Sequence, residues 1–310
     1  MTEFSLQILG CGSALPTVRH NASAQIVDIH GKLFLVDCGE GTQLQMRRQH
    51  TAFARLNHIF ISHLHGDHCF GLIGLISTLA MLGRGHAATL HIHAFPELES
   101  LLRPQLDYFC RDMAYDVQFH PFQPGRSEVI YDDRTVTVTT VPLHHRVPST
   151  GFVFREKPMP AHLRRDMLDY YEIPICYRDR IKRGADYVMP DTGEVIANSL
   201  LTTPAAPPRS YAYLCDTAPV ESCVPLIEGV DMLYHDCTFA TADAQRAHAT
   251  CHSTAAQAAA IAAAAHVGQL VLGHFSARYD DETVLLREAQ DIFPRTLLAH
   301  EGLVVPVEKF

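Results

Sequence analysis

Residues 60–72 read FISHLHGDHCFGL and place four potential metal ligands within six positions. They follow an apolar run that predicts a short buried strand. Because His63 and His65 are two positions apart, an extended backbone would direct both rings to the same side. The glycine that follows lets the chain turn, so that Asp67 and His68 can face a second point. Two pairs of ligands fit two metal ions better than one.

The flanks of this motif favour a metal site over a histidine-rich surface loop. The motif comes directly after the apolar run 58–62 and before 71–82, which has the length and apolar content of a helix. Imidazole combined with carboxylate suits zinc, although the same ligands do not exclude manganese or iron. We therefore expect a metal centre that begins at the end of this strand.

Further ligands are expected where other apolar runs end in polar residues. His144 and His145 follow 135–143, Asp216 ends the run SYAYLCD, and His274 ends QLVLGH. Each residue alone fits an ordinary core or surface position equally well, but their common position after strands favours a shared site. A carboxylate shared at Asp216 would hold two ions close together, the arrangement that activates water against a phosphoester or an amide. One histidine of the adjacent pair is expected to bind and the other not.

The remaining chain predicts a layered α/β protein with long functional loops at strand ends. Its 310 residues are 47% hydrophobic and 19% charged, so they can bury a sizeable core. Helices are expected at 71–82, 97–110 and 253–266, the last with Ser253 and Thr254 near its start. Strands are expected at 4–13, 24–41 (a hairpin around His30-Gly31), 58–62, 89–95, 135–143, 210–217, 231–238 and 269–276.

Cysteine use and the first residues favour a cytoplasmic protein. The nine cysteines are scattered without a CxxC pair, which indicates reduced thiols. The opening MTEFSLQILG lacks the basic region and long apolar stretch of a signal peptide. No run reaches the roughly 18 apolar residues of a membrane span, so no membrane partner is expected.

The segment 155–208 is polar and punctuated by proline, which predicts either an inserted arm or a disordered linker. The protein carries a net charge of −9, which argues against nucleic acid when taken as a whole. Residues 155–183, however, hold eight basic and five acidic side chains, and the densest part includes Arg178, Arg180, Lys182 and Arg183. One basic element can supply the phosphate contacts that dominate nucleic-acid affinity. A solvated charged loop is the alternative.

Motifs along nearly the whole chain resemble the ribonuclease Z family of the metallo-β-lactamase superfamily. The pattern HxHxDH alone indicates only the superfamily, whereas DCGEGTQ, the HST helix start and HFSARY, in this order, are typical of ribonuclease Z. The matching stretches are LGCGSALPT (9–17), FLVDCGEGTQLQM (34–46), PLHHRVPSTGF (142–152), CDT (215–217), HDCTF (235–239), HSTAAQAA (252–259) and HFSARY (274–279). The resemblance implies one domain over 1–310, an αββα sandwich with a protruding tRNA-binding arm inserted at about 155–208.

The resemblance also implies two zinc ions per subunit. One would be held by His63, His65 and His145, the other by Asp67, His68 and His274, with Asp216 bridging both. His145 is preferred to His144 because the family's ligand lies six residues before the glycine of a Gly-aromatic pair, here Gly151-Phe152.

Four residues resemble the family's catalytic groups. Asp67 would be the general base for the attacking water, and His252 the general acid for the leaving 3′ oxygen. His235 and Asp236 occupy the HEAT motif, whose carboxylate orients that acid. Without the resemblance, His252 is interpreted as a helix N-terminal residue with no catalytic task.

The activity implied is removal of the 3′ trailer from precursor tRNA, which leaves a 3′-hydroxyl on the tRNA and a 5′-phosphate on the trailer. The family also implies a homodimer, in which the arm of one subunit serves the active site of the other, and no DNA substrate. One alternative is hydrolysis of a small phosphodiester, thioester or lactone, which would need no basic arm. Another is a non-catalytic RNA-binding scaffold, which the complete ligand set disfavours.

Three departures from the family pattern carry expectations of their own. The stretch 172–184 lacks the usual Gly-Pro-rich arm tip, so the arm is expected to grip differently. Asp236 is one methylene shorter than the usual glutamate, so its contact with His252 is expected to be longer or bridged by water. The loop PTVRHN (16–21) replaces PxKxRN close to the cleavage position, which affects the response to an encoded CCA.

Overall fold

Two seven-stranded sheets form the middle of the larger unit in the computed structural model, which describes residues 4–86 and 88–310. The first sheet has the order β18-β1-β2-β3-β4-β5-β6 and the second β17-β16-β15-β14-β9-β8-β7. The first consists of β1 (Phe4–Gly10), β2 (Ala24–Ile29), β3 (Lys32–Val36), β4 (Leu56–Phe60), β5 (Thr89–Ala94), β6 (Asp116–Pro121) and β18 (Val304–Pro306). The second consists of β7 (Val129–Asp132), β8 (Val136–Pro142), β9 (Thr150–Glu156), β14 (Ser210–Leu214), β15 (Met232–Asp236), β16 (Gln269–Gly273) and β17 (Thr296–Leu298).

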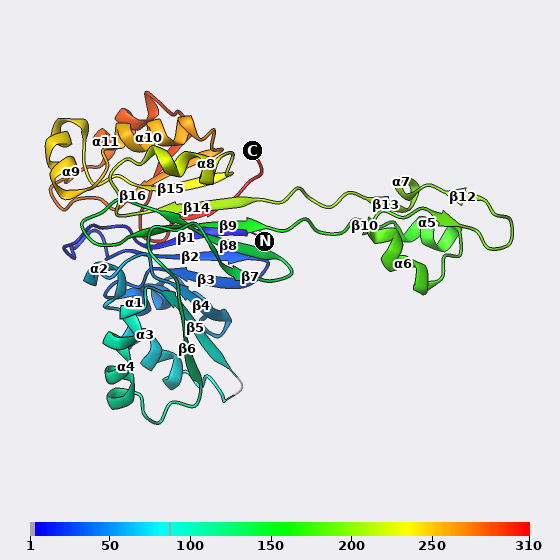
Figure 1. The fold of residues 1–310 in the computed structure, drawn as a ribbon, viewed down its shortest axis with the longest axis horizontal. Helices are drawn as coiled ribbons and strands as arrows, with labels where there is room; N and C mark the ends of the chain where they lie inside the picture. The colour runs from blue at the N-terminus through cyan, green and yellow to red at the C-terminus, as the bar shows by residue number, and fades with distance from the viewer. Residues whose placement is uncertain (1–3, 87) are drawn as a thin grey trace. The chain divides into compact units, whose positions relative to one another are not determined.

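Helices cover the outer face of each sheet, so the unit has the four layers αββα (Figure 1). Over the first sheet lie α1 (Thr42–Arg48), α3 (Leu72–Met81) and α4 (Glu97–Phe109). Over the second lie α8 (Val224–Ile227), α10 (Ala255–Ala264) and α11 (Thr283–Gln290), while α2 (Gly66–Cys69) and α9 (Ala244–Thr250) are short. The predicted αββα sandwich is confirmed.

Local sequence explains how several elements begin and end. Strands β2 and β3 pair Ile29 with Lys32, and the two residues between them, His30 and Gly31, have φ of 51° and 84°. Positive φ at both positions is the geometry of a tight hairpin turn, as the sequence predicts. Helix α10 begins at a capping box in which Thr254 accepts from the backbone N–H of Gln257.

The strands that lead into the predicted ligands end earlier than the sequence suggests. Strand β14 ends at Leu214 and β16 at Gly273, each three residues short of its predicted end. The reason is local backbone geometry, because Asp216 and His274 have left-handed φ of 54° and 63° and cannot continue a strand. Since β14, β15 and β16 run parallel, their carboxyl ends meet at one edge of the sheet.

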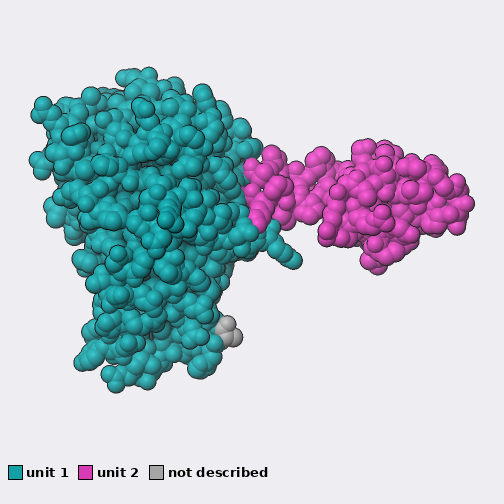
Figure 2. Space-filling view, viewed as in Figure 1, with its two compact units in different colours: residues 1–155, 209–310 teal, residues 156–208 magenta. Residues whose placement is uncertain are grey.

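The smaller unit, Glu156–Pro208, is inserted between β9 and β14 and is folded rather than a disordered linker (Figure 2). Its elements are β10 (His162–Leu163), α5 (Arg165–Tyr170), α6 (Ile175–Lys182), β11 (Tyr187–Val188), β12 (Val195–Ile196), α7 (Asn198–Leu201) and β13 (Thr202–Thr203). A small core of six buried side chains holds them together, namely Leu168, Ile173, Ile181, Tyr187, Ile196 and Leu201. Apolar residues spaced singly along a polar segment therefore suffice for this core.

In the described ranges 4–86 and 88–310, no helix is both long and apolar enough to cross a lipid bilayer.

Candidate metal centre

The seven residues predicted as metal ligands lie in two adjoining groups at the carboxyl ends of the strands. Within each group the ligand atoms lie within 4.8 Å of one another. One group consists of His63, His65, His145 and Asp216, and the other of Asp67, His68 and His274.

The Asp216 carboxylate faces both groups, one oxygen to each. Its Oδ2 lies 3.3 Å from Nε2 of His63 and 3.5 Å from Nε2 of His145. Its Oδ1 lies 2.7 Å from Nε2 of His274 and 3.4 Å from Nε2 of His68. Because the side chain is 2% exposed, the charge is held in a setting where it needs cationic partners. This is the geometry of a bridging carboxylate.

The free ring nitrogens of three histidines fit a metal. Nε2 of His68, His145 and His274 is buried without a hydrogen-bond partner. The Nδ1 atom of each ring contacts an oxygen of the protein. Nδ1 of His68 lies 2.7 Å from Asp37 Oδ2. Nδ1 of His145 lies 3.0 Å from the carbonyl of Cys251, and Nδ1 of His274 lies 2.9 Å from Thr238 Oγ1. Nδ1–H bonds of this kind fix the tautomer and leave the Nε2 lone pair for an ion.

The electrostatics also require cations at this place. Burial alone would lower the pKa of His274, but Asp216 and Asp67 outweigh it and raise this pKa to about 10. The pKa of His68 is raised above its ordinary value for the same reason, against burial, by Asp216 and Asp37. The carboxylates thus hold protons on His68 and His274, and bound metal cations can take the place of these protons. Burial instead lowers the pKa of His63, and it lowers that of His145 to about 4.

Two residues that support the ligands were not singled out from the sequence. Asp37, wholly buried, accepts from Nδ1 of His68, from the hydroxyl of Tyr213 at 2.6 Å and from the N–H and hydroxyl of Ser62 at 2.8 Å. Thr238 donates to Asp236 at 2.7 Å and contacts Nδ1 of His274. Only their place within the motifs DCGEG and HDCTF could have indicated a role.

His252 and Asp236 are in direct contact, so the expectation of a longer or water-bridged contact was wrong. Nδ1 of His252 lies 2.7 Å from Oδ2 of Asp236. The backbone N–H groups of Thr217 and Thr238 donate to the two oxygens of Asp236 at 3.1 and 2.9 Å. These bonds fix the short side chain in reach of His252, whose own backbone follows Cys251 in the left-handed region at φ 58°.

His252 lies beside both ligand groups. Its ring centroid is 4.9 Å from that of His145 and 5.3 Å from that of His274. The residue is 8% exposed, so it is nearly buried beside the ligands.

The structure does not bring His235 to the centre. Neighbouring residues of a strand point to opposite faces, so His235 and Asp236 cannot both face the ligands. His235 is buried, its Nδ1 donates to the carbonyl of Asp236 at 2.9 Å, and burial lowers its pKa. It belongs to none of the metal-ligating clusters found in the described part of the chain.

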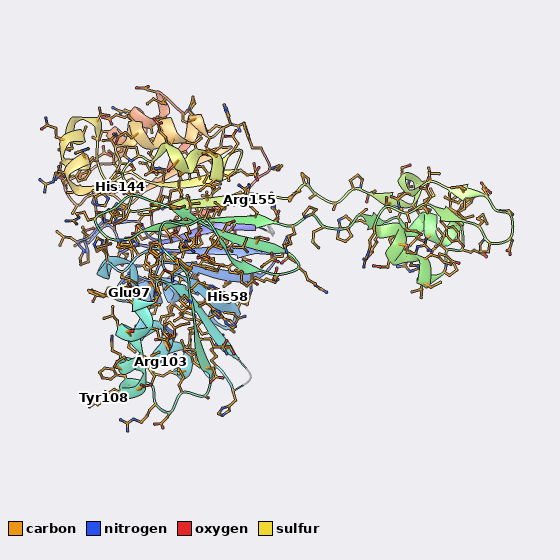
Figure 3. All side chains as sticks on the ribbon, viewed as in Figure 1. His58, Glu97, Arg103, Tyr108, His144 and Arg155 are labelled. Carbon is orange, nitrogen blue, oxygen red and sulfur yellow. The ribbon has the colours of Figure 1, made fainter. Side chains whose placement is uncertain are left out.

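The two adjacent histidines of the loop between β8 and β9 lie in different surroundings. His145 is in the ligand group, whereas His144 is exposed (Figure 3) and contributes its backbone N–H to Thr217 Oγ1 at 3.2 Å. The choice left open by strand position alone therefore falls on His145.

A hollow of about 410 Å³ opens beside Asp67. Asp67 accepts from the backbone N–H of Ala14 at 2.7 Å, so the loop after β1 touches the centre directly. The side chains around the hollow include Glu40, Phe70 and Arg146. Polar and aromatic groups at its rim suit a nucleotide substrate.

The four basic residues singled out in the smaller unit differ in exposure. Arg180, Lys182 and Arg183 are exposed, at or next to the end of α6. Arg178 is half-buried, and its guanidinium donates to the carbonyl of Ile173 at 3.3 Å. Arg178 therefore also ties the unit's own fold together.

Comparisons with known proteins agree with this geometry. The chain is 58% identical over 308 residues to a Ribonuclease Z of Phocaeicola vulgatus, covering 99% of each chain, and 56% identical over 305 residues to one of Bacteroides fragilis, covering 98% and 99%. Residues 4–160 match the family model described as Anti-Pycsar protein Apyc1. Among solved structures, the short form of human tRNase Z has a TM-score of 0.71 at 24% identity and covers 98% of this chain and 99% of its own, which shows a shared fold.

Proposed function

We infer that this chain is the endoribonuclease that processes the 3′ end of precursor tRNA, because it belongs to the ribonuclease Z family. Through residues 4–160 it also belongs to the Anti-Pycsar protein Apyc1 family. The family predicted from the motifs is thereby confirmed. The observation that carries the reaction type is the Asp216 carboxylate, with one oxygen toward each ligand group, beside His252. A bridged pair of metal positions is suited to hydrolysis of a phosphodiester.

The ligand chemistry supports two zinc ions, one in each group. Imidazole and carboxylate donors with buried, unpartnered Nε2 atoms fit zinc. When bound, the ions supply Lewis acidity to the attacking water and to the phosphate oxygens. The remaining steps belong to side chains of the protein.

Asp67 orients the attacking water and takes its proton. Burial would raise the pKa of this carboxyl, but His274 and His68 hold it well below its usual range, so the group is ionised. The Ala14 N–H fixes Oδ2, which leaves Oδ1 as the acceptor for the water.

His252 donates a proton to the leaving 3′ oxygen. Asp236 accepts from Nδ1 and thereby directs Nε2 toward the substrate side. The products are a tRNA with a 3′-hydroxyl and a trailer with a 5′-phosphate.

The exposed bases of α6 support a role for the smaller unit in tRNA binding. Arg180, Lys182 and Arg183 can contact phosphates, and each contact would add to the salt dependence of binding. Replacing all three with alanine should weaken precursor binding and flatten its dependence on salt, while turnover of a small diester stays unchanged. An unchanged Kd for the precursor would remove the smaller unit from substrate binding.

A homodimer is supported by apolar side chains left exposed on α4. Leu101 and Tyr108 (Figure 3 labels Tyr108), 61% and 69% exposed, lie seven positions apart and so share one face of the helix. Phe109, the next residue, is also exposed. Apolar groups gathered on an outer helix face are typical of a protein contact. Light scattering should give twice the chain mass, and Tyr108→Glu should reduce it to one chain.

The activity is tested with a precursor tRNA that carries a short 3′ trailer, beside bis-p-nitrophenyl phosphate. We expect one cut next to the discriminator base that disappears after chelation and returns with zinc. The cut position also reports the effect of the PTVRHN loop. Turnover of the small diester with intact precursor would favour a small-molecule hydrolase instead.

A further inference from the structure

A second set of metal-ligating side chains lies outside the centre just described. Cys11 follows β1, His20 precedes β2, and Glu301 lies between β17 and β18. Their ligand atoms lie within 4.8 Å of one another. The distances are 3.3 Å from Cys11 Sγ to His20 Nδ1, 3.1 Å from that Nδ1 to Glu301 Oε2, and 3.9 Å from Sγ to Glu301 Oε1.

These spacings match those of the main centre. There, His63 Nε2 and His145 Nε2 lie 3.3 and 3.5 Å from Asp216 Oδ2. Donors bound tetrahedrally to one zinc ion, at bond lengths of about 2.0 to 2.3 Å, lie roughly 3.5 Å apart. Thiolate, imidazole and carboxylate are also the three donor types that zinc prefers.

Neighbouring groups orient each donor toward the common point. Nε2 of His20 faces Glu282 Oε1 at 3.3 Å, which places a proton there and leaves Nδ1 for ligation. Glu301 Oε1 accepts from the backbone N–H of Asn21 at 2.7 Å, so Oε2 is directed at His20. A donor set with its own supporting hydrogen bonds is preorganised for an ion.

The charge of the cluster also suits a dication. Cys11 is wholly buried, and burial together with Glu301 and Glu282 raises its thiol pKa well above the ordinary value. Hydrogen bonding to Glu301 raises the pKa of His20 despite its partial burial. A divalent ion would displace the thiol proton and the Nδ1 proton of His20, so that two positive charges replace two protons and the net charge is conserved.

We propose that Cys11, His20 and Glu301 form a further binding site for a divalent transition metal, preferentially zinc, with a fourth position open to water. This site does not depend on the proposed function. Its three donors come from separate parts of the chain, so a bound ion would fasten the ends of the loop 11–21 to the segment after β17.

The site has a consequence for the main centre. The loop 11–21 donates the Ala14 N–H to Asp67, and the carbonyl of Cys11 accepts from the N–H of Phe275, which follows His274, at 2.9 Å. A metal at the base of this loop would therefore hold in place the backbone that orients Asp67. Its role there is positional rather than chemical.

Cobalt distinguishes the two sites because only this one contains a thiolate. The full chain, freed of metal and loaded with Co²⁺, should show a near-ultraviolet thiolate-to-cobalt band, and zinc-loaded protein should hold about three ions per chain. Cys11→Ser should abolish the band and lower the content to about two ions. Cys69→Ser is the matched control, since Cys69 Sγ lies 3.2 Å from the carbonyl of His65, near the main centre; this variant should keep the band.

The wild-type spectrum alone can overturn the proposal, so it does not depend on the variants folding. No thiolate band at saturating Co²⁺, or a band lost in Cys69→Ser but kept in Cys11→Ser, would overturn it. His20→Gln gives a second check and should lose one ion while the far-ultraviolet circular dichroism stays native. Precursor cleavage by the same preparations tests the proposed function separately.

Discussion

Two clusters of histidine side chains in the larger unit differ in whether carboxylates face their rings. In the metal centre, His68, His145 and His274 are each held through Nδ1 and present Nε2 to the Asp216 carboxylate. The second cluster, which we call the imidazole array, consists of His58, His91, His93 and His120 on β4, β5 and β6 (Figure 3 labels His58). The comparison shows what a histidine cluster needs in order to bind metal.

The imidazole array pairs its rings with one another. Strand register sets His58 beside His91 and His93 beside His120, with ring centroids 4.7 and 4.8 Å apart. Nδ1 of His58 lies 3.2 Å from Nε2 of His93, and Nδ1 of His91 lies 2.8 Å from Nε2 of His120. Each such contact requires one N–H and one lone pair, so one ring of each pair accepts through an unprotonated nitrogen.

The pKa values follow the surroundings. Burial and the neighbouring imidazoles lower the pKa of His58 to about 4 and that of His93 to about 2. In the metal centre, carboxylates raise the pKa of His274 to about 10 against burial. The array belongs to none of the metal-ligating clusters among the described residues. Carboxylates and the direction of the free nitrogens, rather than the number of histidines, therefore distinguish a metal centre.

The largest effect is expected for Asp216→Asn. The amide keeps the shape but removes the charge that faces both ligand groups, so precursor cleavage should fall by roughly 1,000-fold or more. Metal content measured by atomic absorption should fall in parallel. Full activity in this variant would contradict the bridging role.

His145→Ala should come next, with a loss of about 100-fold in kcat/KM. His144→Ala is the matched control, because the His144 side chain is exposed and only its backbone is bonded to the site. The activity of this variant should stay within about threefold of wild type. Equal losses in the two variants would mean that the loop, and not the Nε2 ligand, matters.

Asp236→Asn should lower kcat by about 100-fold while the metal content stays unchanged. The carboxylate accepts from Nδ1 of His252 and so fixes the ring that donates to the leaving oxygen. His252→Ala should lower kcat by a similar factor without loss of metal. A variant that loses metal instead would place Asp236 among the ligands.

The smallest effect concerns stability and the imidazole array. His58 and His93 have folded pKa values below the unfolded value of about 6.5, so the unfolded state binds more protons between pH 6.5 and 4. Stability is therefore complete above this range and falls as the pH drops through it. Lys32 and Asp133, the charged groups near His58, act on its pKa in opposite directions.

His93→Phe should reduce this pH dependence, because phenylalanine keeps the stack on Phe60, whose ring centroid is 4.4 Å away. Urea unfolding at pH 7 and pH 5 should show a difference smaller by about 1 kcal/mol than in wild type. Cleavage at pH 7 should be unchanged. An unaltered slope would show that the array does not control acid stability.

The sequence by itself determined everything that depends on local spacing. The HxHxDH pattern after a strand, the His30-Gly31 turn, the capped helix at Thr254 and the polar segment near 155–208 all follow from backbone periodicity and turn preference. The residues that form each of these signals lie within a short stretch of the chain, so the signals can be recognised without knowledge of the fold. The family resemblance added the grouping of distant ligands.

Tertiary structure decided which side chains meet across the strands. Asp37 and Thr238 contact the ligands His68 and His274 because the ends of parallel strands meet at one edge of the sheet. Asp236 contacts His252 because two backbone N–H groups hold its carboxylate in place. Strand alternation turned His235 away from the same site. The physical reason is that contacts between distant segments depend on sheet register and on how the layers pack, and the spacing of residues along the chain records neither.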